Sequence, residues 1–140
     1  MSASSCVFCG IVSGELAAHR VLENETVVAF LDKKPLFHGH VLVIPRAHVV
    51  TLPDLPSAEI APFFTSVRTL ARVVPTALGA EGTFVAMNNV VSQSVPHLHA
   101  HVVPRKKKDG LKGFFWPRTS YVSDAAMDEV ASKIRAALAG

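Results

Sequence analysis

Histidine and apolar residues alternate without interruption from His97 to Val103, and this pattern constrains the fold more than any other feature of the chain. Successive side chains of a β-strand point to opposite faces, so the alternation predicts a strand with one polar and one apolar face. Residues two apart on such a strand lie about 6.6–7 Å from each other on the same side. The polar face carries His97, His99 and His101, and the apolar residues between them face the core. We expect Pro104 to end this strand because proline cannot donate to a sheet ladder.

Three imidazoles on one face of a strand allow several interpretations. They can form a satisfied polar surface or bind metal adventitiously. A catalytic zinc held by all three is a sharper alternative, since metalloenzymes use three histidine ligands. Better metal ligands in the first half of the chain argue against that alternative.

Short apolar and β-branched runs predict four further strands. They are Val21–Glu23, Thr26–Leu31, Val41–Ile44 and Thr83–Asn88. The third run is unbroken and stops at Pro45, which is typical of a central strand. Strands gathered around one main helix favour an antiparallel α+β domain over a doubly wound sheet.

Apolar residues recur at helical spacing from Ser57 to Leu78, so we expect the main helix there, capped by Ser57 and stopped by Gly79. Pro62 and Pro75 fall inside this span and are expected to kink or shorten it. A second helix is expected after Ser123. Its apolar face consists of Met127, Val130, Ala131, Ile134 and Leu138.

Composition narrows the class of protein. The 140 residues suit one domain, and 49% hydrophobic against 18% charged residues indicates a globular chain and not a disordered one. Most of the net charge of +3 lies in residues 105–108, a run that we interpret as a solvated turn and not as a nucleic-acid site. No run is long enough to span a membrane, and the N-terminus lacks the pattern of a secretory signal. We therefore expect a cytoplasmic protein that binds neither nucleic acid nor membrane.

Two cysteines, Cys6 and Cys9, are the only ones in the chain. Disulfides are disfavoured in the cytoplasm, so this pair suggests a metal site or a redox motif. A thioredoxin-like motif sits between a strand and a helix, which the first ten residues do not provide. Zinc in a structural site takes four cysteine or histidine ligands, so two more would be needed. Free structural thiols are the main alternative.

With these motifs in view, the chain resembles the histidine triad (HIT) hydrolase family, whose signature is His-φ-His-φ-His-φ-φ with φ apolar. Every position from His97 to Val103 fits it. The resemblance includes Cys6–Cys9, Val28–Asp32, Gly39–His48, Asn88 and Gln93–Val95, and it is closest to the HINT-like, zinc-containing bacterial branch. It implies a single HIT domain over residues 1–140, with an antiparallel sheet of about five strands in a core of about residues 6–104. Residues 105–140 would then be a C-terminal extension that carries an aromatic cluster and a helix.

The resemblance implies a nucleotide hydrolase that cleaves purine nucleotide conjugates at the α-phosphate, with adenosine 5′-phosphoramidates as the expected substrates. His99 would attack phosphorus and form a covalent nucleotidyl intermediate, which water then hydrolyses. His101 would donate to a phosphate oxygen. His40 matches a fourth active-site histidine that supports the triad, and Ser94 would assist the leaving group.

The resemblance also assigns a nucleotide pocket. Asp32 would bind the ribose hydroxyls, and the base would lie against an apolar wall. That wall would comprise Phe8, Ile11, Phe30 and Leu42, and the phosphate would meet Asn88, Gln93, Ser94 and Val95 together with His99 and His101. The phosphate loop is about two residues shorter than in many relatives, with Ser92 where glycine is frequent and Pro96 before the triad. Leaving-group preference is the property that these departures affect.

Cys6, Cys9, His48 and His97 would form a structural zinc site by the same resemblance. Relatives are homodimers whose sheets join, which sets the expectation for this chain. Residues 113–118 form an aromatic cluster with the only tryptophan. We favour packing of the C-terminal helix as its role over coverage of a substrate pocket.

Other functions remain open at this level. A dinucleoside polyphosphate hydrolase differs only in its leaving group. A nucleotidyltransferase of the sugar-phosphate class has glutamine in place of the last triad histidine, so His101 argues against it. A nucleotide-binding or zinc-stabilised interaction module with little turnover is the alternative outside enzymology.

Overall fold

The computed structural model describes residues 5–111 and 118–140. Its chain divides into two compact units, residues 1–109 and 110–140, which are considered separately below. Most of the aromatic cluster expected at residues 113–118 lies outside the described residues. The expectation of one HIT domain over the whole chain stays a prediction.

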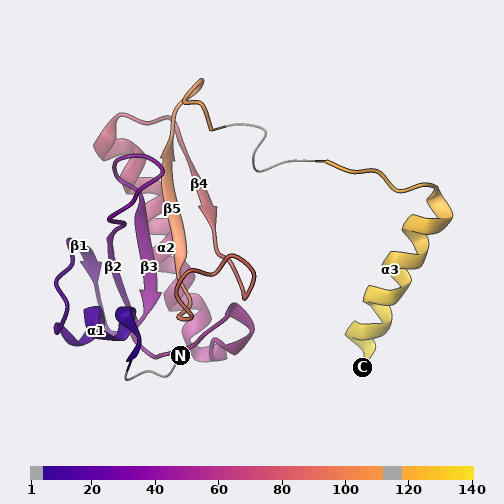
Figure 1. The fold of residues 1–140 in the computed structure, drawn as a ribbon, viewed down its shortest axis with the longest axis horizontal. Helices are drawn as coiled ribbons and strands as arrows, with labels where there is room; N and C mark the ends of the chain where they lie inside the picture. The colour runs from indigo at the N-terminus through magenta and orange to yellow at the C-terminus, as the bar shows by residue number, and fades with distance from the viewer. Residues whose placement is uncertain (1–4, 112–117) are drawn as a thin grey trace. The chain divides into compact units, whose positions relative to one another are not determined.

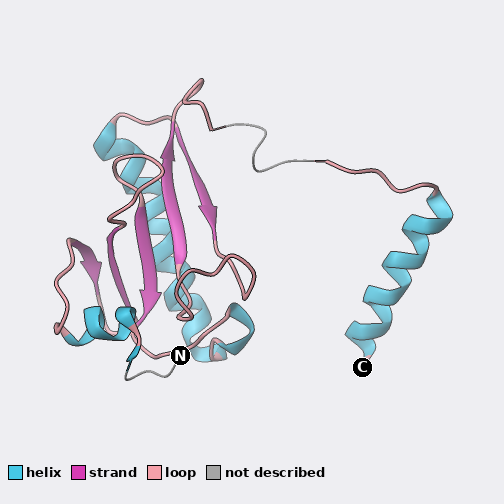
Figure 2. Cartoon of the chain, viewed as in Figure 1, coloured by secondary structure: helices cyan, strands magenta, loops and turns pink. Residues whose placement is uncertain are grey.

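A five-stranded sheet forms the centre of the first unit (Figures 1 and 2). Its strands are β1 (Arg20–Glu23), β2 (Val27–Leu31), β3 (Val41–Pro45), β4 (Gly82–Ala86) and β5 (Ala100–Arg105). Their order across the sheet is β1-β2-β3-β5-β4, and every neighbouring pair is antiparallel. The predicted antiparallel α+β fold is therefore confirmed, with strand ends within two residues of expectation in the first four strands.

The boundaries predicted for the histidine strand are wrong at both ends. β5 begins at Ala100, because the amide of Leu98 donates to the carbonyl of Val49 at 2.8 Å instead of joining the sheet. Pro104 lies inside β5. Beyond Val102, β5 pairs with β4 alone and no longer with β3, so a residue without an N–H is tolerated on the side of β3. The alternation of faces nevertheless extends upstream of the strand. Leu98 is fully buried in the core, while His97 and His99 belong to the opposite face.

Helix α2 (Ser57–Leu78) covers one face of the sheet (Figure 1). Its buried residues, Phe63, Val67, Leu70 and Val74, pack against alternate residues of β2, β3 and β5. The helix has the predicted bounds and runs through Pro62 and Pro75, so the expectation that these prolines shorten it is wrong. Gly79 ends it with a left-handed φ of 67°. Its N-cap is Pro56 and not Ser57, which is the first helical residue.

Helix α1 (Val7–Ser13), which the sequence did not predict, lies on the other face. Phe8 and Ile11 are its buried residues, and they join a second apolar cluster with Phe30, Leu42 and Ile44. Cys6 caps the helix, since its Sγ accepts from the amide of Cys9 at 3.4 Å. The face opposite α2 therefore holds α1, both cysteines and the histidines.

Two further helical elements complete the described residues. A short 3-10 helix, η2 (Leu52–Asp54), follows β3. In the second unit, α3 (Asp124–Ala139) begins where predicted, with the Ser123 hydroxyl accepting from the amide of Ala126 at 3.1 Å. Among the described residues, no helix combines the length and apolarity that crossing a membrane requires.

Candidate functional site

Two clusters of side chains lie next to each other on the face of the sheet that carries α1. The first contains Cys6, Cys9, His48 and His97, whose sulfur and nitrogen atoms all lie within 4.8 Å of one another. Three chain segments supply them: the cap and first turn of α1, the loop after β3 and the segment before β5. These are the four residues that the resemblance implied as metal ligands.

The distances within this first cluster suit a tetrahedral ion. Nδ1 of His97 lies 3.3 Å from Sγ of Cys6, 3.6 Å from Sγ of Cys9 and 3.3 Å from Nδ1 of His48. The Cys9 sulfur is 3.2 Å from Nδ1 of His48. Zinc bonds to sulfur and nitrogen place the ligand atoms of a tetrahedron about 3.3–3.8 Å apart. These four distances therefore fit such an ion to within a few tenths of an ångström, and the other two pairs of ligand atoms lie within 4.8 Å.

The protonation pattern of the first cluster favours a cation as well. Nε2 of His97 donates to the carbonyl of Pro45 at 2.9 Å, so its Nδ1 holds a lone pair that faces the sulfurs. Burial, aided by the neighbouring Cys6, raises the pKa of Cys9 to about 11. A metal cation bound beside the Cys9 thiol would favour its thiolate form and offset this effect.

The second cluster contains His40, His99 and His101. Nδ1 of His99 donates to the carbonyl of His97 at 2.8 Å, which leaves Nε2 with the lone pair. Nε2 of His40 and Nδ1 of His101 are hydrogen-bonded at 2.9 Å. The rings of His99 and His101 are neighbours, with centroids 5.0 Å apart. An unprotonated nitrogen and a second imidazole thus face the same space.

Burial keeps His40 and His101 of the second cluster neutral near pH 7. Desolvation, together with the nearby His99 and His40, lowers the pKa of His101 to about 4. Desolvation also lowers the pKa of His40, against the opposing effect of Asp32, whose Oδ2 lies 3.7 Å from Nε2 of His40. Asp32, His40 and His101 also satisfy the spacing of a metal-binding group, but the His40–His101 hydrogen bond occupies two of the nitrogens that would be needed.

A cavity of about 360 Å³ opens beside His99 and His101. Nine of the eleven residues expected to bind nucleotide line this cavity. They are Phe8, Ile11, Phe30, Asp32, Leu42, Ser94, Val95, His99 and His101. His40 does not line the cavity and lies behind His101.

The two remaining residues, Asn88 and Gln93, hold the phosphate loop together instead of lining the cavity. Asn88 donates to the carbonyl of Ser92 at 3.3 Å, and Gln93 accepts from the amide of Val90 at 3.0 Å while donating to the carbonyl of Val50 at 2.6 Å. Ser92 has a φ of 62°, the left-handed region that favours glycine. Glycine would therefore adopt the backbone conformation of position 92 with less strain than serine.

Several residues of the cavity were not predicted. Leu16, Ala17, Ala18 and His19 follow α1, and Lys33 follows Asp32. His19 therefore adds a further imidazole to the cavity wall. No motif marks these positions, because the connection between α1 and β1 brings them to the cavity.

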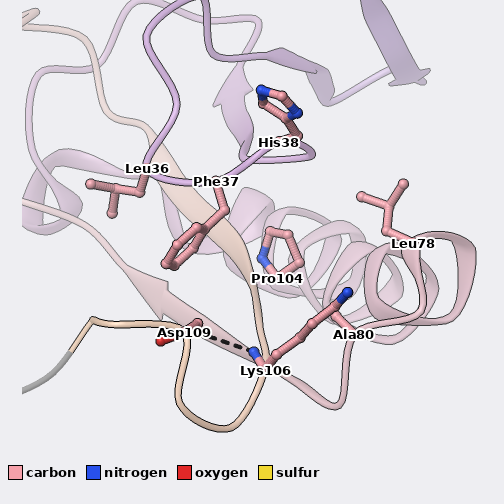
Figure 3. Close-up of a pocket in the computed structure, with 8 residues that line it drawn as sticks. All are labelled: Leu36, Phe37, His38, Leu78, Ala80, Pro104, Lys106 and Asp109. Carbon is pink, nitrogen blue, oxygen red and sulfur yellow. Dashed lines mark hydrogen bonds between the residues drawn. The ribbon is translucent and has the colours of Figure 1, made fainter.

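A second cavity, of about 510 Å³, lies elsewhere in the first unit (Figure 3). Its lining comes from the loop before β3, the C-terminal end of α2 and the hairpin after β5: Leu36, Phe37, His38, Leu78, Ala80, Pro104, Lys106 and Asp109. Lys106 donates its backbone amide to Asp109 at 3.1 Å, so the acidic group is already engaged. This cavity contains none of the residues of the two clusters.

Comparisons with known proteins agree with this arrangement. The HIT domain family matches the chain over residues 13–108. The chain is 32% identical over 136 residues to the adenosine 5′-monophosphoramidase hnt1 of Schizosaccharomyces pombe. The aligned region covers 94% of this chain and 99% of that protein.

Solved structures show the same fold. A crystal structure of a protein from Streptococcus mutans UA159 matches with a TM-score of 0.87 and 31% identity, over 98% of this chain and 87% of that one. A zinc-bound histidine triad family protein from Mycobacterium smegmatis matches with a TM-score of 0.74 and 35% identity, over 94% of this chain and 99% of that one.

Proposed function

The chain belongs to the HIT domain family, and from this premise we propose that it hydrolyses purine nucleotide conjugates at the α-phosphate, with adenosine 5′-phosphoramidates as its substrates. One observation carries the proposal. Nδ1 of His99 donates to the carbonyl of His97, so the unprotonated Nε2 remains for attack beside a cavity of about 360 Å³. The S. pombe relative, named as an adenosine 5′-monophosphoramidase, supports the choice of substrate.

The reaction proceeds in two displacements. Nε2 of His99 attacks the α-phosphorus, the bond from phosphorus to the leaving nitrogen breaks, and the departing amine takes up a proton. Water then attacks the same phosphorus, the bond to His99 breaks, and the nucleoside monophosphate and a neutral imidazole are released. His101 donates to a phosphate oxygen during both steps, where such a donor stabilises the charge of the transition state.

The cavity supplies the remaining roles. Its apolar wall of Phe8, Ile11, Phe30 and Leu42 receives the purine, and Asp32 accepts hydrogen bonds from the ribose hydroxyls. Ser94, beside Val95 on the same wall, assists the leaving group. Asn88 and Gln93 act on the phosphate indirectly, by fixing the loop.

We further propose that Cys6, Cys9, His48 and His97 hold a structural zinc ion. Four protein ligands close the coordination shell, so the ion stabilises the fold and takes no part in turnover. It ties the start of α1 to the loop after β3 and to the triad segment. The zinc-bound M. smegmatis relative supports this assignment.

The proposal includes a cytoplasmic homodimer. β4 is an edge strand of the sheet, and Val85 at its centre is 43% exposed, so a second copy can extend the sheet there. Sedimentation velocity tests the dimer directly. A species with the mass of one chain at micromolar concentration would contradict it.

A dinucleoside polyphosphate hydrolase is the second candidate, and the short phosphate loop favours it. Val90 and Val91 at its tip are 74% and 78% exposed, so a large leaving group meets little obstruction there. Attack by His99 is common to both functions, and only the leaving group differs.

One experiment separates these functions. Purified protein is incubated with an adenosine 5′-phosphoramidate and, separately, with a diadenosine polyphosphate, and release of adenosine monophosphate is measured. Acid quenching followed by intact-mass spectrometry detects the nucleotidyl adduct. We expect turnover of the phosphoramidate and an adduct that His99→Ala abolishes, while the exposed His38→Ala retains both.

Each result decides between hypotheses. Faster cleavage of the diadenosine substrate would select the second candidate. Nucleotide binding without cleavage of either substrate would select the interaction module. Full activity of His99→Ala would show that the nucleophile is assigned wrongly.

A further inference from the structure

We propose that the backbone amide of Leu36 fixes the tautomer of His40 and, through it, that of His101, so that His101 presents an N–H to the nucleotide cavity. Leu36 lies in the loop between β2 and β3, and its amide donates to Nδ1 of His40 at 3.1 Å. The catalytic consequence rests on the proposed function, whereas the tautomers themselves do not.

The first step concerns His40. A neutral imidazole carries a single ring proton, and the nitrogen that accepts a hydrogen bond cannot hold it. Because Nδ1 of His40 accepts from Leu36, its proton resides on Nε2. His40 is buried, at 3% exposure, and both of its ring nitrogens have protein partners.

The second step concerns the position of the ring proton of His101. Nε2 of His40 lies 2.9 Å from Nδ1 of His101, and since the former carries the proton, the latter accepts. The proton of a neutral His101 therefore resides on its own Nε2. The reverse arrangement would place a proton on Nδ1 of His40, directly opposite the amide hydrogen of Leu36.

Asp32 is the other group that faces Nε2 of His40. Its Oδ2 is 3.7 Å away, too far for a good hydrogen bond, and its Oδ1 accepts from the amide of Lys34 at 2.9 Å. The negative charge of Asp32 nevertheless favours a proton on the nitrogen that faces it. Asp32 and Leu36 thus act on opposite nitrogens of His40 in the same sense.

The loop that presents this amide is held on both sides. The amide of Asp32 donates to the carbonyl of His40 at 2.9 Å, and the amide of His40 donates to the carbonyl of Phe37 at 3.0 Å. Gly39 has a φ of +98°, and a Cβ there would lie 2.1 Å from Cδ1 of Leu78 at the end of α2. The positive φ favours glycine at this position, and the end of α2 lies directly against the loop.

The side chain and the amide of Leu36 serve different parts of the molecule. The side chains of Leu36, Phe37 and His38 line the second cavity (Figure 3), whereas the amide of Leu36 reaches His40. A change of side chain at position 36 can therefore leave the hydrogen bond intact. This separation provides a matched control.

The fixed tautomers give the two triad histidines opposite roles. His99 carries its proton on Nδ1 and offers a lone pair at Nε2, while His101 carries its proton on Nε2 and offers a donor. Should His101 exchange tautomer, its lone pair would face the phosphate oxygens and repel them. Loss of one well-placed donor of this kind typically lowers kcat by about 10²–10³-fold.

The decisive experiment replaces only the N–H. Leucine at position 36 is exchanged for its α-hydroxy acid, which converts the amide to an ester and keeps the side chain, and Leu36→Ala serves as the control. Two-bond ¹⁵N–¹H spectra report the tautomers of His40 and His101. Turnover of an adenosine 5′-phosphoramidate is measured on the same samples.

In the wild type and in Leu36→Ala we expect Nε2–H tautomers at both histidines. In the ester variant, where only Asp32 still favours Nε2–H, we expect the share of Nδ1–H forms to rise at both histidines, with kcat lowered about tenfold or more and KM changed much less. Unchanged tautomers in the ester variant would overturn the proposal. The expected tautomer change in the ester variant, found in a protein whose wild type lacks phosphoramidase activity, would instead contradict only the proposed function.

Two variants of His40 test the same relay without backbone chemistry. The amide of His40→Gln can reach His101 and donate to it, whereas His40→Asn can accept from Leu36 but is too short to reach His101. We expect His40→Gln to retain more kcat than His40→Asn and to keep the Nε2–H form of His101. The opposite ranking would show that His40 does not act by donating to His101.

Discussion

The two clusters on the α1 face use neighbouring histidines of one segment in opposite ways. His97 donates a hydrogen bond from Nε2 to the carbonyl of Pro45, and its Nδ1 faces two thiols. His99 donates a hydrogen bond from Nδ1 to the carbonyl of His97, and its Nε2 faces the cavity. The contrast teaches that a backbone carbonyl, by selecting one ring nitrogen, decides where the lone pair of each histidine points.

Access to solvent separates the clusters further. Cys6 is 5% exposed and His97 fully buried, and protein atoms supply all four potential ligands of the first cluster. His99 is 2% exposed but lines a cavity of about 360 Å³. A closed set of ligands suits a structural ion, whereas an open position beside a lone pair suits a reaction.

Replacement of His97 or of His99 by alanine should have the largest effects, and it tests whether the two clusters have separate functions. We expect His99→Ala to lower kcat about 10³-fold or more, as removal of a nucleophile does, with little change in melting temperature. His97→Ala should lower the melting temperature and the zinc content, while the protein that remains folded still turns over. Steady-state kinetics and thermal denaturation of both variants make the test.

These two variants must not behave alike. A His97→Ala protein that is stable and retains zinc but lacks activity would assign His97 to catalysis. A His99→Ala protein that loses zinc would place both histidines in one site.

Loss of zinc should have the next largest effect. We expect about one zinc ion per chain in the wild type and far less in Cys9→Ser, because three ligands remain. The ion closes a loop between the start of α1 and the segment before β5, and losing about 3 kcal/mol of stability lowers the melting temperature of a domain this size by about 10 °C. Elemental analysis and calorimetry measure the two quantities.

Ser13→Ala, at the other end of α1, provides the control. Its hydroxyl donates to the carbonyl of Gly10 at 3.0 Å and lies outside the cluster. Equal zinc in Cys9→Ser and Ser13→Ala would defeat the proposal of four ligands.

Much of this fold follows from the sequence alone. Period-two and helical patterns located five strands and the main helix, because those elements bury one side against a common core. Helix α1 was missed because seven residues that include glycine and valine form no stable helix unaided. It exists through the packing of Phe8 and Ile11 on the sheet and the cap supplied by Cys6.

The site divides in the same way. The resemblance to the family implied that His99, His101 and Asp32 share one site and that the four potential metal ligands come together, and the structure places each set side by side. The amide of Leu36 escaped prediction because a backbone group leaves no mark on the sequence. The start of β5 also escaped, since the amide of Leu98 has a loop carbonyl as its partner.

Acid should affect the second cluster through His101. Its pKa is about 4 in the folded chain against about 6.5 when unfolded, so the unfolded chain binds more protons between these values. The free energy of unfolding therefore falls as the pH falls from about 6.5 to about 4, by on the order of 2 kcal/mol for this group, and is unaffected by it above pH 7. The rate constant kcat/KM should likewise be level near pH 7 and fall towards pH 4.

Urea unfolding at pH 7 and pH 4.5 measures the effect in the wild type and in His101→Asn. Acid release of zinc is common to both proteins and cancels in their difference. The wild type should lose more stability than His101→Asn, and equal losses would remove His101 as the source.

Phe8 tests whether the clusters are independent, and here we expect the smallest effect. Its ring lies between them, with its centroid 5.8 Å from that of His97 and 5.1 Å from that of His99, both edge to face. Such contacts are worth about 0.5–1.5 kcal/mol each beyond burial. We expect Phe8→Leu to cost about 1 kcal/mol in stability, to leave the zinc content unchanged and to raise KM a few-fold, because the ring also lines the nucleotide cavity.

The matched control is Phe64→Leu. Phe64 lies on α2 and is 38% exposed, so its replacement should alter neither the zinc content nor KM. If Phe8→Leu loses zinc and turnover in proportion, the shared wall couples the two clusters, and their separate functions would have to be assigned to one site.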